Sequence, residues 1–302
     1  MTSSNHPDAV DWTTLLAHPD LVTLIELALR EDIGAGDVTT DAIFTTPQRV
    51  AGRIVTRHVS VVCGLPLAQA LLSRQDPTAT YDQVAPEGKE LPAKATLLAF
   101  EADVRAVLTL ERTLLNFMMR LCGVASAARL AVAALPEGAR SRIYDTRKTT
   151  PGWRLLDKAA VRTGGAENHR IGLFDAVLIK DNHVAAAGSV ARAVAMTRAH
   201  VGRLPIEAEI DRLEQLEEAI NAGADIVLLD NMSCEEMRQA VELARGRVEL
   251  EASGGITLQR IPEIARTGVD RISLGALTHT VRPADLSLEI DAASARLEPR
   301  SR

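Results

Sequence analysis

The sequence has few of the residues that would indicate a disulfide-stabilised, zinc-binding or nucleic-acid-binding protein. Its 302 residues include only three cysteines, Cys63, Cys122 and Cys234, which are odd in number and far apart. Their spacing fits neither a metal motif nor a disulfide framework, so a cytosolic chain with reduced thiols is favoured. The formal net charge is −6, which argues against the broad basic surface that general nucleic-acid binding needs.

Long apolar runs and targeting signals are also missing. No apolar run approaches the roughly 18 residues that span a bilayer. The first 20 residues lack the basic start and the apolar stretch of a signal peptide. The chain is 46% apolar and 25% charged, an ordinary globular balance, and is long enough for one large domain or two moderate ones. These features predict a cytoplasmic protein that binds neither membranes nor nucleic acids.

The first 122 residues predict a small N-terminal domain that mixes helices and strands. The expected elements are helices over residues 21–30 and 104–122, and strands over residues 51–64 and within 82–100. Residues 1–20 are polar and are expected to be flexible, and the second helix is expected to end before Gly123. An α+β sandwich domain is therefore predicted over residues 21–122. A helix-like pattern over residues 285–297 predicts that the C-terminal segment 285–302 packs back on this domain.

From Ile143 onward the chain repeats one unit, a short apolar run that ends on a polar residue or a glycine. Such runs are typical of parallel strands that are buried on both faces. The end residues lie 29, 21, 23 and 22 positions apart, which leaves room for one helix and two short loops between strands. They are Lys180, Glu209, Asp230, Ser253 and Gly275. About six strands fit before Gly275, fewer than the eight of a complete barrel, so the fold class is α/β, with an incomplete (β/α) barrel over residues 123–284.

Because the carboxyl ends of parallel strands lie at one face, these end residues are expected to be neighbours at an active site. Lys180 can serve as a Schiff-base nucleophile or an anion clamp, or it can simply pair with a neighbouring acid. Glu209 and Asp230 end adjacent strands and can hold Mg²⁺ with its waters, grip sugar hydroxyls or stabilise a developing cation. Glu207 points to the same side as Glu209, and the position nearest the strand end favours Glu209.

Two basic segments and two glycine-containing loops add to this predicted site. Residues 145–154 (DTRKTTPGWR) place two cations after a short apolar run, where they can bind carboxylates or phosphates or form a solvated loop. Residues 164–170 (GGAENHR) combine glycines with His169 and Arg170. The loops at residues 253–255 and 274–276 follow the last two strands, where barrels commonly form a phosphate cradle. The whole set suits a phosphorylated sugar that reacts with a polycarboxylate.

Taken in order, these motifs resemble the quinolinate phosphoribosyltransferase family, also called nicotinate-nucleotide pyrophosphorylase (carboxylating). The resemblance covers nearly the whole chain after residue 20. It is carried by residues 30–40, 111–117, 146–154, 168–170, 180–183, 229–231 and 252–256. One departure is Glu167, which adds a negative charge to the glycine-rich loop where the family more often has another glycine.

The resemblance implies an enzyme of NAD biosynthesis, a pentosyltransferase with a two-domain fold. It would transfer phosphoribosyl from 5-phosphoribosyl-1-diphosphate to quinolinate with decarboxylation, giving nicotinate mononucleotide, diphosphate and CO₂. The resemblance also implies a Mg²⁺ cofactor and a homodimer in which each active site borrows Arg112 from the partner subunit, with further assembly left open.

The residues that match the family's site are assigned by the same resemblance. Quinolinate would contact Arg147, His169 and Arg170, and Glu209 and Asp230 would approach the ribose and Mg²⁺, directly or through water. The implied catalytic residues are Lys148, Lys180, Glu209 and Asp230. The implied substrate-binding residues are Arg112, Thr146, Arg147, Lys148, His169, Arg170, Lys180, Glu209, Asp230, Ser253, Gly254, Gly255, Ser273, Leu274 and Gly275.

Other functions remain open at this point. A paralogue associated with molybdenum transport shares several motifs, and nicotinate phosphoribosyltransferases share the chemistry. An aldolase using Lys180 and a non-catalytic nucleotide-binding protein are alternatives from other classes. The second carboxylate of quinolinate is what requires so many cations, so the full set favours quinolinate.

Overall fold

The structure, a computed structural model, describes residues 10–291 and divides the chain into two compact units. The first unit combines the chain up to residue 127 with residues 151–164 and with the chain from residue 281. The second unit comprises residues 128–150 and 165–280. The predicted α/β class is confirmed, because the chain forms a four-stranded and a two-stranded antiparallel sheet and a six-stranded parallel sheet that does not close.

The first unit is built on a four-stranded antiparallel sheet with the order β12-β1-β5-β3. Its helices are α1 (Trp12–Leu16), α2 (Pro19–Ile33), α3 (Val38–Ile43), α4 (Leu65–Gln75), most of α5 (Val104–Ala133) and α6 (Arg154–Gly164). Its strands are β1 (Arg49–Thr56), β2 (Ser60–Val61), β3 (Thr80–Val84), β4 (Glu90–Leu91), β5 (Thr96–Asp103) and β12 (Leu286–Ile290). The core lies between this sheet and the helices, and includes the fully buried Ile54, Leu98, Leu114 and Met118.

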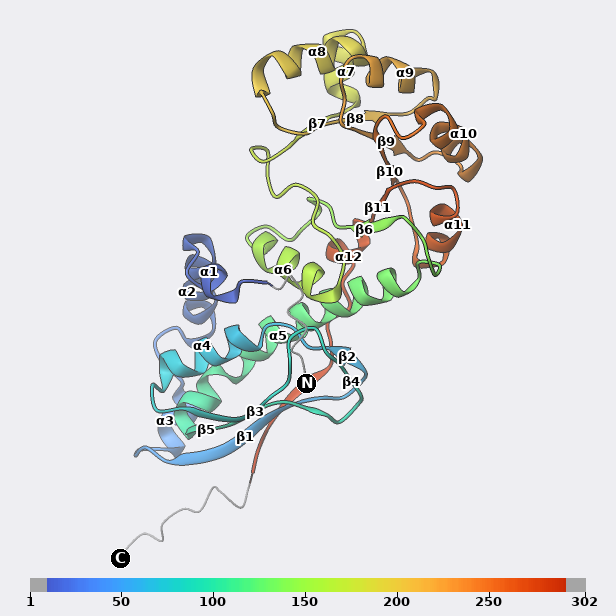
Figure 1. The fold of residues 1–302 in the computed structure, drawn as a ribbon. Helices are drawn as coiled ribbons and strands as arrows, with labels where there is room; N and C mark the ends of the chain where they lie inside the picture. Colours follow the sequence, from blue (N-terminus) through green and yellow to red (C-terminus); the bar gives the residue numbers. More distant parts are fainter. Residues whose placement is uncertain (1–9, 292–302) are drawn as a thin grey trace, which may run out of the picture. The chain divides into compact units, whose positions relative to one another are not determined.

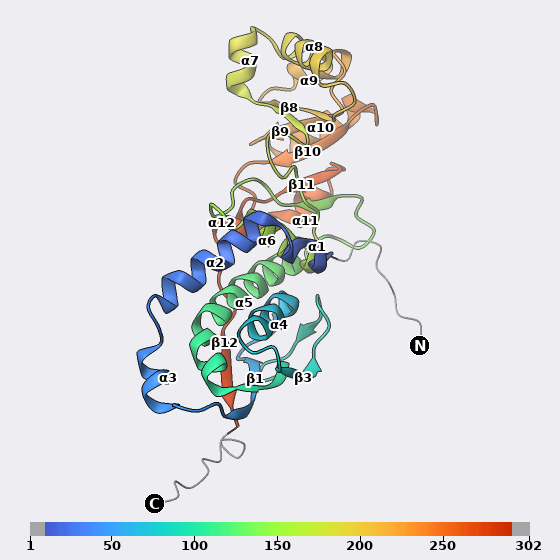
Figure 2. The same cartoon turned by 90° about the vertical axis from the view of Figure 1, so that its left-hand side faces the viewer.

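Both ends of the first unit differ from the prediction. Residues 10–20 were expected to be flexible, but Asp11 caps helix α1 and Trp12 is buried; residues 1–9 lie outside the described residues. The segment from residue 285 was expected to be helical, but it forms strand β12, antiparallel to β1 (Figure 2). Leu286, Leu288 and Ile290 alternate along the chain, a spacing that suits an edge strand. The part of the predicted helix beyond residue 291 lies outside the described residues.

Helix α5 does not end at Gly123 as expected but continues to Ala133. A side chain at Gly123 would lie 2.5 Å from the carbonyl oxygen of Arg282. The glycine therefore allows the backbone before β12 to approach the helix, and it does not serve as a C-cap.

Among the described residues, α5 is the one helix that is long and apolar enough to cross a bilayer. However, 56% of its apolar stretch is buried inside the structure. A core helix passes the same test of length and composition, and the buried Leu110, Phe117 and Leu121 give α5 that role.

Residues 151–164, which the sequence analysis includes in the barrel domain, group with the first unit. The Trp153 ring stacks on Phe117 with centroids 4.9 Å apart. The Arg120 guanidinium lies over Trp153 and donates two hydrogen bonds of 2.9 Å to Asp157, which is fully buried. These contacts hold the segment against α5.

We expect Asp157→Ala to destabilise the first unit by about 3–5 kcal/mol, because removing one partner leaves the other charge of a buried pair uncompensated. Urea unfolding followed by circular dichroism measures this. Glu217→Ala is the control, since Glu217 pairs with Arg247 at the exposed surface, and surface pairs contribute little. Equal unfolding midpoints for the two variants would contradict the structural role given to Asp157.

The second unit is a six-stranded parallel sheet with the order β6-β11-β10-β9-β8-β7. Its strands are β6 (Arg142–Tyr144), β7 (Val177–Ile179), β8 (Ile206–Ile210), β9 (Ile226–Asp230), β10 (Glu249–Ser253) and β11 (Arg271–Ser273). Its helices are α7 (Asp181–Ala187), α8 (Val190–Val201), α9 (Glu214–Asn221), α10 (Cys234–Ala244), η1 (Leu258–Arg260), α11 (Ile261–Ala265) and α12 (Ala276–His279). Helices α8 to α11 cover the outside of the curved sheet (Figure 1). Strands β6 and β7 are its two edges, so the barrel is incomplete, as predicted.

Candidate active site

A cavity of about 850 Å³ lies at the carboxyl ends of the parallel strands, within the second unit. Every predicted site residue of that unit lines it. They are Thr146, Arg147, Lys148, His169, Arg170, Lys180, Glu209, Asp230, Ser253, Gly254, Gly255, Ser273, Leu274 and Gly275. Arg112 does not line this cavity, because it is an exposed residue of α5 in the first unit. The roles assigned to these residues stay predictions.

Strand register explains why residues distant in sequence meet here. Ser253 is paired with Asp230 at the ends of β10 and β9, and Ser273 with Tyr144 at the ends of β11 and β6. Successive strands therefore deliver their last residues at the same level. This level forms the rim of the cavity.

The loop after β6 places its two cations through contacts with α12 and the turn before it. The Lys148 amide donates to Thr146 Oγ1 at 3.0 Å, and the Lys148 carbonyl accepts from Thr278 Oγ1 at 2.8 Å. A side chain at Gly275 would lie 2.9 Å from Lys148 Cδ. The lysine stem thus lies on a glycine of the last cavity loop, and a larger residue there would displace it.

His169 and Arg170 are positioned by a short extension of the sheet beside β6. The Glu167 backbone pairs with Tyr144 and accepts from the Asp145 amide at 3.0 Å. The fully buried Asp145 carboxylate in turn accepts from the His169 amide at 2.7 Å. Glu167 does not line the cavity and contributes to this loop through its backbone. Asp145 was not among the predicted site residues, and its carboxylate positions His169.

Glu209 and Asp230 form the acidic side of the cavity. Burial raises the pKa of Glu209, Lys180 acts in the opposite direction, and Asp230 raises it further. Asp230 Oδ2 accepts a hydrogen bond of 2.8 Å from the Asn231 side chain. Two carboxylates close enough to influence each other are the hard oxygen donors that Mg²⁺ prefers, so the donor set fits this ion.

The loop after β10 requires glycine at position 254. Gly254 has φ +98°, and a Cβ there would meet the Asn231 carboxamide and lie 2.9 Å from the Asn231 amide nitrogen. Asn231 itself has φ 54° and donates its amide to Ser253 at 3.0 Å. The loops after β9 and β10 are therefore locked together, with Gly254 at their contact.

We expect Gly254→Ala to lower kcat/KM for a phosphorylated substrate at least ~10-fold, because the methyl group forces these loops apart. Gly246→Ala is a matched control, since Gly246 also has positive φ (+73°) but open space around it. Steady-state kinetics on both variants separates loop displacement from backbone strain alone. Equal losses in the two would refute the steric argument.

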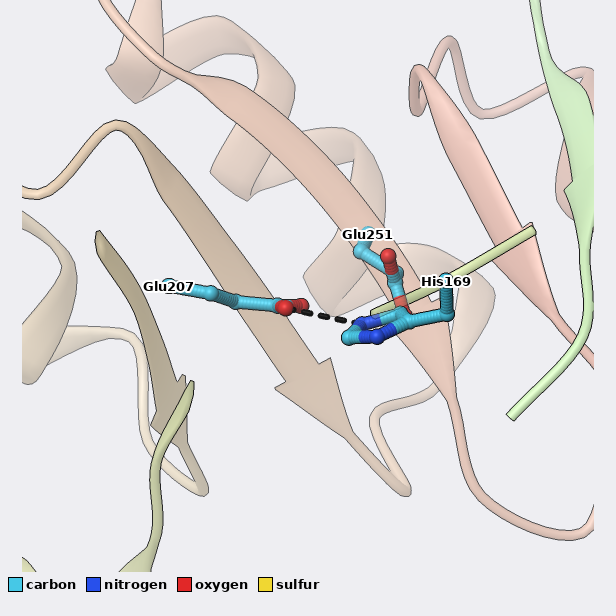
Figure 3. Close-up of side chains that lie close together, drawn as sticks. All are labelled: His169, Glu207 and Glu251. Atoms are coloured by element: carbon cyan, nitrogen blue, oxygen red, sulfur yellow. Dashed lines mark ion pairs between the residues drawn. The ribbon is translucent and has the colours of Figure 1, made fainter. Parts of the chain in front are cut away.

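Two buried acids beneath the cavity, Glu207 and Glu251, were not among the predicted site residues. Glu207 Oε2 lies 2.8 Å from His169 Nε2, and Glu251 Oε1 lies 3.7 Å from the same atom (Figure 3). Each acid lies two positions before a predicted strand-end residue, so it shares that residue's orientation. This alternation was the signal that could have found them. It placed Glu207 and Glu209 on the same side of the strand and could not choose between them, and both in fact face the barrel interior.

Comparison with known proteins identifies the family. The profile of the quinolinate phosphoribosyl transferase N-terminal domain matches residues 37–122, and that of its C-terminal domain matches residues 124–289. A Bacillus subtilis protein named probable nicotinate-nucleotide pyrophosphorylase (carboxylating) is 39% identical, with 93% of this chain and 97% of the relative covered. The Mycobacterium leprae nicotinate-nucleotide pyrophosphorylase (carboxylating) is 40% identical, with 88% and 95% covered.

The solved structures agree with this result. The nicotinate-nucleotide pyrophosphorylase from Francisella tularensis superposes with a TM-score of 0.87 at 39% identity, covering 92% of this chain and 99% of that one. The two domain profiles match in order, and the relatives match over nearly their full length. The chain therefore belongs to the quinolinate phosphoribosyl transferase family.

Proposed function

We propose that the protein is a nicotinate-nucleotide pyrophosphorylase (carboxylating), which makes nicotinate mononucleotide from quinolinate and 5-phosphoribosyl-1-diphosphate. The observation that carries this is a single cavity with four Arg and Lys side chains, the strand-end acids Glu209 and Asp230, and glycine loops at strand ends. The basic group consists of Arg147, Lys148, Arg170 and Lys180. A substrate with two carboxylates explains this excess of cations better than one with a single carboxylate.

The first step joins the substrates. The C–O bond to diphosphate breaks, and its electron pair leaves with the diphosphate while positive charge develops on the ribose ring. Glu209 and Asp230 stabilise that charge, while Arg147 and Arg170 hold the substrate carboxylates and orient the pyridine nitrogen. The nitrogen lone pair then forms the new bond to the sugar carbon.

The second step is loss of CO₂. The bond between the ring and the carboxylate next to nitrogen breaks, and its electron pair stays on the ring carbon beside the positive nitrogen. CO₂ leaves, and the carbon takes up a proton. Because the quaternary nitrogen stabilises the carbanion, the step needs no covalent nucleophile on the protein.

Mg²⁺ is proposed as the cofactor, with Glu209 and Asp230 holding it directly or through water. When bound, the ion would offset the negative charge of the leaving diphosphate. The protein is also proposed to be a cytoplasmic homodimer in which the partner's copy of Arg112 completes each site.

The decisive experiment is release of CO₂ from carboxyl-labelled quinolinate by the purified protein, with and without 5-phosphoribosyl-1-diphosphate. We expect release only when both substrates and Mg²⁺ are present. Nicotinate is added as a competitor, and it should inhibit weakly because it lacks the second carboxylate. Absence of CO₂ release, or faster turnover of nicotinate, would overturn the proposal.

A further inference from the structure

Three side chains beneath the cavity form a buried polar cluster that the proposed reaction does not use. Glu207 comes from β8, Glu251 from β10 and His169 from the loop after the β6 extension (Figure 3). Their polar atoms lie within 4.8 Å of one another. Glu207 is 3% exposed and Glu251 is 0% exposed. Two acids that are removed from water and this close cannot both ionise without a large cost.

The hydrogen bonds of His169 define the proton on its ring. Its Nδ1 accepts a hydrogen bond of 2.8 Å from the Arg170 amide, so no proton can be carried there. The ring proton is therefore on Nε2, which faces Glu207 Oε2 at 2.8 Å. A metal ion at this cluster would need the Nε2 lone pair, so the ring orientation favours a proton over a metal.

The imidazole can satisfy only one of the two acids. Its Nε2–H lies within hydrogen-bond distance of Glu207, whereas both carboxyl oxygens of Glu251 have no hydrogen-bond partner among the described residues. Burial, followed by the Glu207 carboxylate, raises the pKa of Glu251 to about 7, while His169, Ser273 and Arg271 act in the opposite direction. The geometry therefore pairs Glu207 with the imidazole and leaves the proton on Glu251, whose carboxyl oxygens lack a hydrogen-bond partner among the described residues.

The charged side chains near Glu251 come from several elements. Arg271 acts on it from β11 and Glu207 from β8, while Arg147 and Arg170 line the same cavity from two loops. Burial and then Arg147 lower the pKa of Arg170, and Glu207 opposes this, so the acids and the guanidinium groups sense one another. The remaining charged side chains that line the cavity are Lys148, Lys180, Glu209 and Asp230. If Glu251 ionised, three carboxylates and four cations would line the cavity, and the excess of positive charge would be smaller.

We propose that Glu251 is a positioning residue held as a neutral carboxylic acid beneath the cavity, and that its ionisation weakens the binding of a dianionic substrate in the cavity. The inference rests on the proposed function, because it takes quinolinate as that dianion. Binding of the dianion and loss of the Glu251 proton oppose each other, since both add negative charge to the same buried region.

The test is the pH dependence of kcat and of KM for quinolinate in the wild type and in Glu251→Gln, which is neutral at every pH. In the wild type, KM should rise about three- to tenfold between about pH 6.5 and 8.5, with a smaller change in kcat. Glu251→Gln should bind quinolinate with a KM that is nearly flat over this range. Glu217→Gln, at an exposed glutamate of α9 outside the cavity lining, should keep the wild-type rise.

A second measurement uses the wild type alone, in case the glutamine variant does not fold. Calorimetric titration with quinolinate near pH 8, in two buffers of different ionisation enthalpy, should show net proton uptake on binding. Persistence of the KM rise in Glu251→Gln, or binding without proton uptake, would overturn the inference while leaving CO₂ release by the wild type intact. Wild-type protein that releases no CO₂ would instead end the proposed function itself.

Discussion

Arg147→Ala is expected to lower kcat/KM by roughly 10²- to 10³-fold, and Lys180→Ala by a similar factor. Both side chains end or follow a strand and reach the same cavity. A charge-assisted contact to a carboxylate or a phosphate is roughly twice as strong as a hydrogen bond between neutral groups. The Arg147 Nε atom is buried and has no hydrogen-bond partner in the described structure, as expected of a donor that awaits a substrate.

The control for these variants is Arg142→Ala. Arg142 begins the strand that precedes Arg147, but it is an exposed side chain that pairs with Glu249 outside the cavity lining. Steady-state kinetics should give nearly wild-type kcat/KM for Arg142→Ala. If Arg147→Ala and Lys180→Ala were equally unaffected, the assignment of the cavity as the active site would be wrong.

Borohydride trapping with a carbonyl substrate separately tests the aldolase alternative, and we expect no adduct at Lys180.

The convergence of the barrel strand ends at one face could be predicted from sequence, because parallel topology leaves few choices. Apolar runs separated by a single helix must place their last residues at one face, so Lys180, Asp230 and Ser253 could be brought together without knowing any side-chain contact. The incomplete closure followed from strand number alone. Periodicity and spacing therefore predicted that these residues meet at one face, where the cavity lies.

Features that depend on tertiary contacts could not be predicted in this way. Residues 285–297 have apolar spacing compatible with a helix, while Leu286–Ile290 also alternate as a strand would, and pairing with the edge of β1 decides between the two. Gly123 has the position of a helix end, yet the neighbouring backbone of Arg282 is what requires it. The neutral state of Glu251 likewise depends on its burial and on Glu207, neither of which a single sequence reports.

Mixing two inactive variants, Arg112→Ala and Lys180→Ala, is expected to restore activity to about a quarter of the wild-type level if the proposed dimer forms. Each variant alone lacks one essential side chain at both of its sites. In a mixed dimer, the site on the Arg112→Ala subunit keeps its own Lys180 and receives the partner's Arg112, so it is complete. The other site lacks both. Random exchange makes about half of the dimers mixed, each with one working site of two.

The structure motivates this choice of residue. Arg112 is exposed on α5, while its neighbour Thr113 is buried and donates to Asp32 at 2.9 Å, which fixes this turn of the helix. An arginine on an exposed face of a helix whose backbone is already fixed suits donation to another subunit, because little backbone freedom is lost on assembly. Activity is measured after the variants are unfolded together and refolded, with each variant refolded alone as the control. If Arg112 acted within its own subunit, neither site of a mixed dimer would be complete, and the mixture would stay inactive.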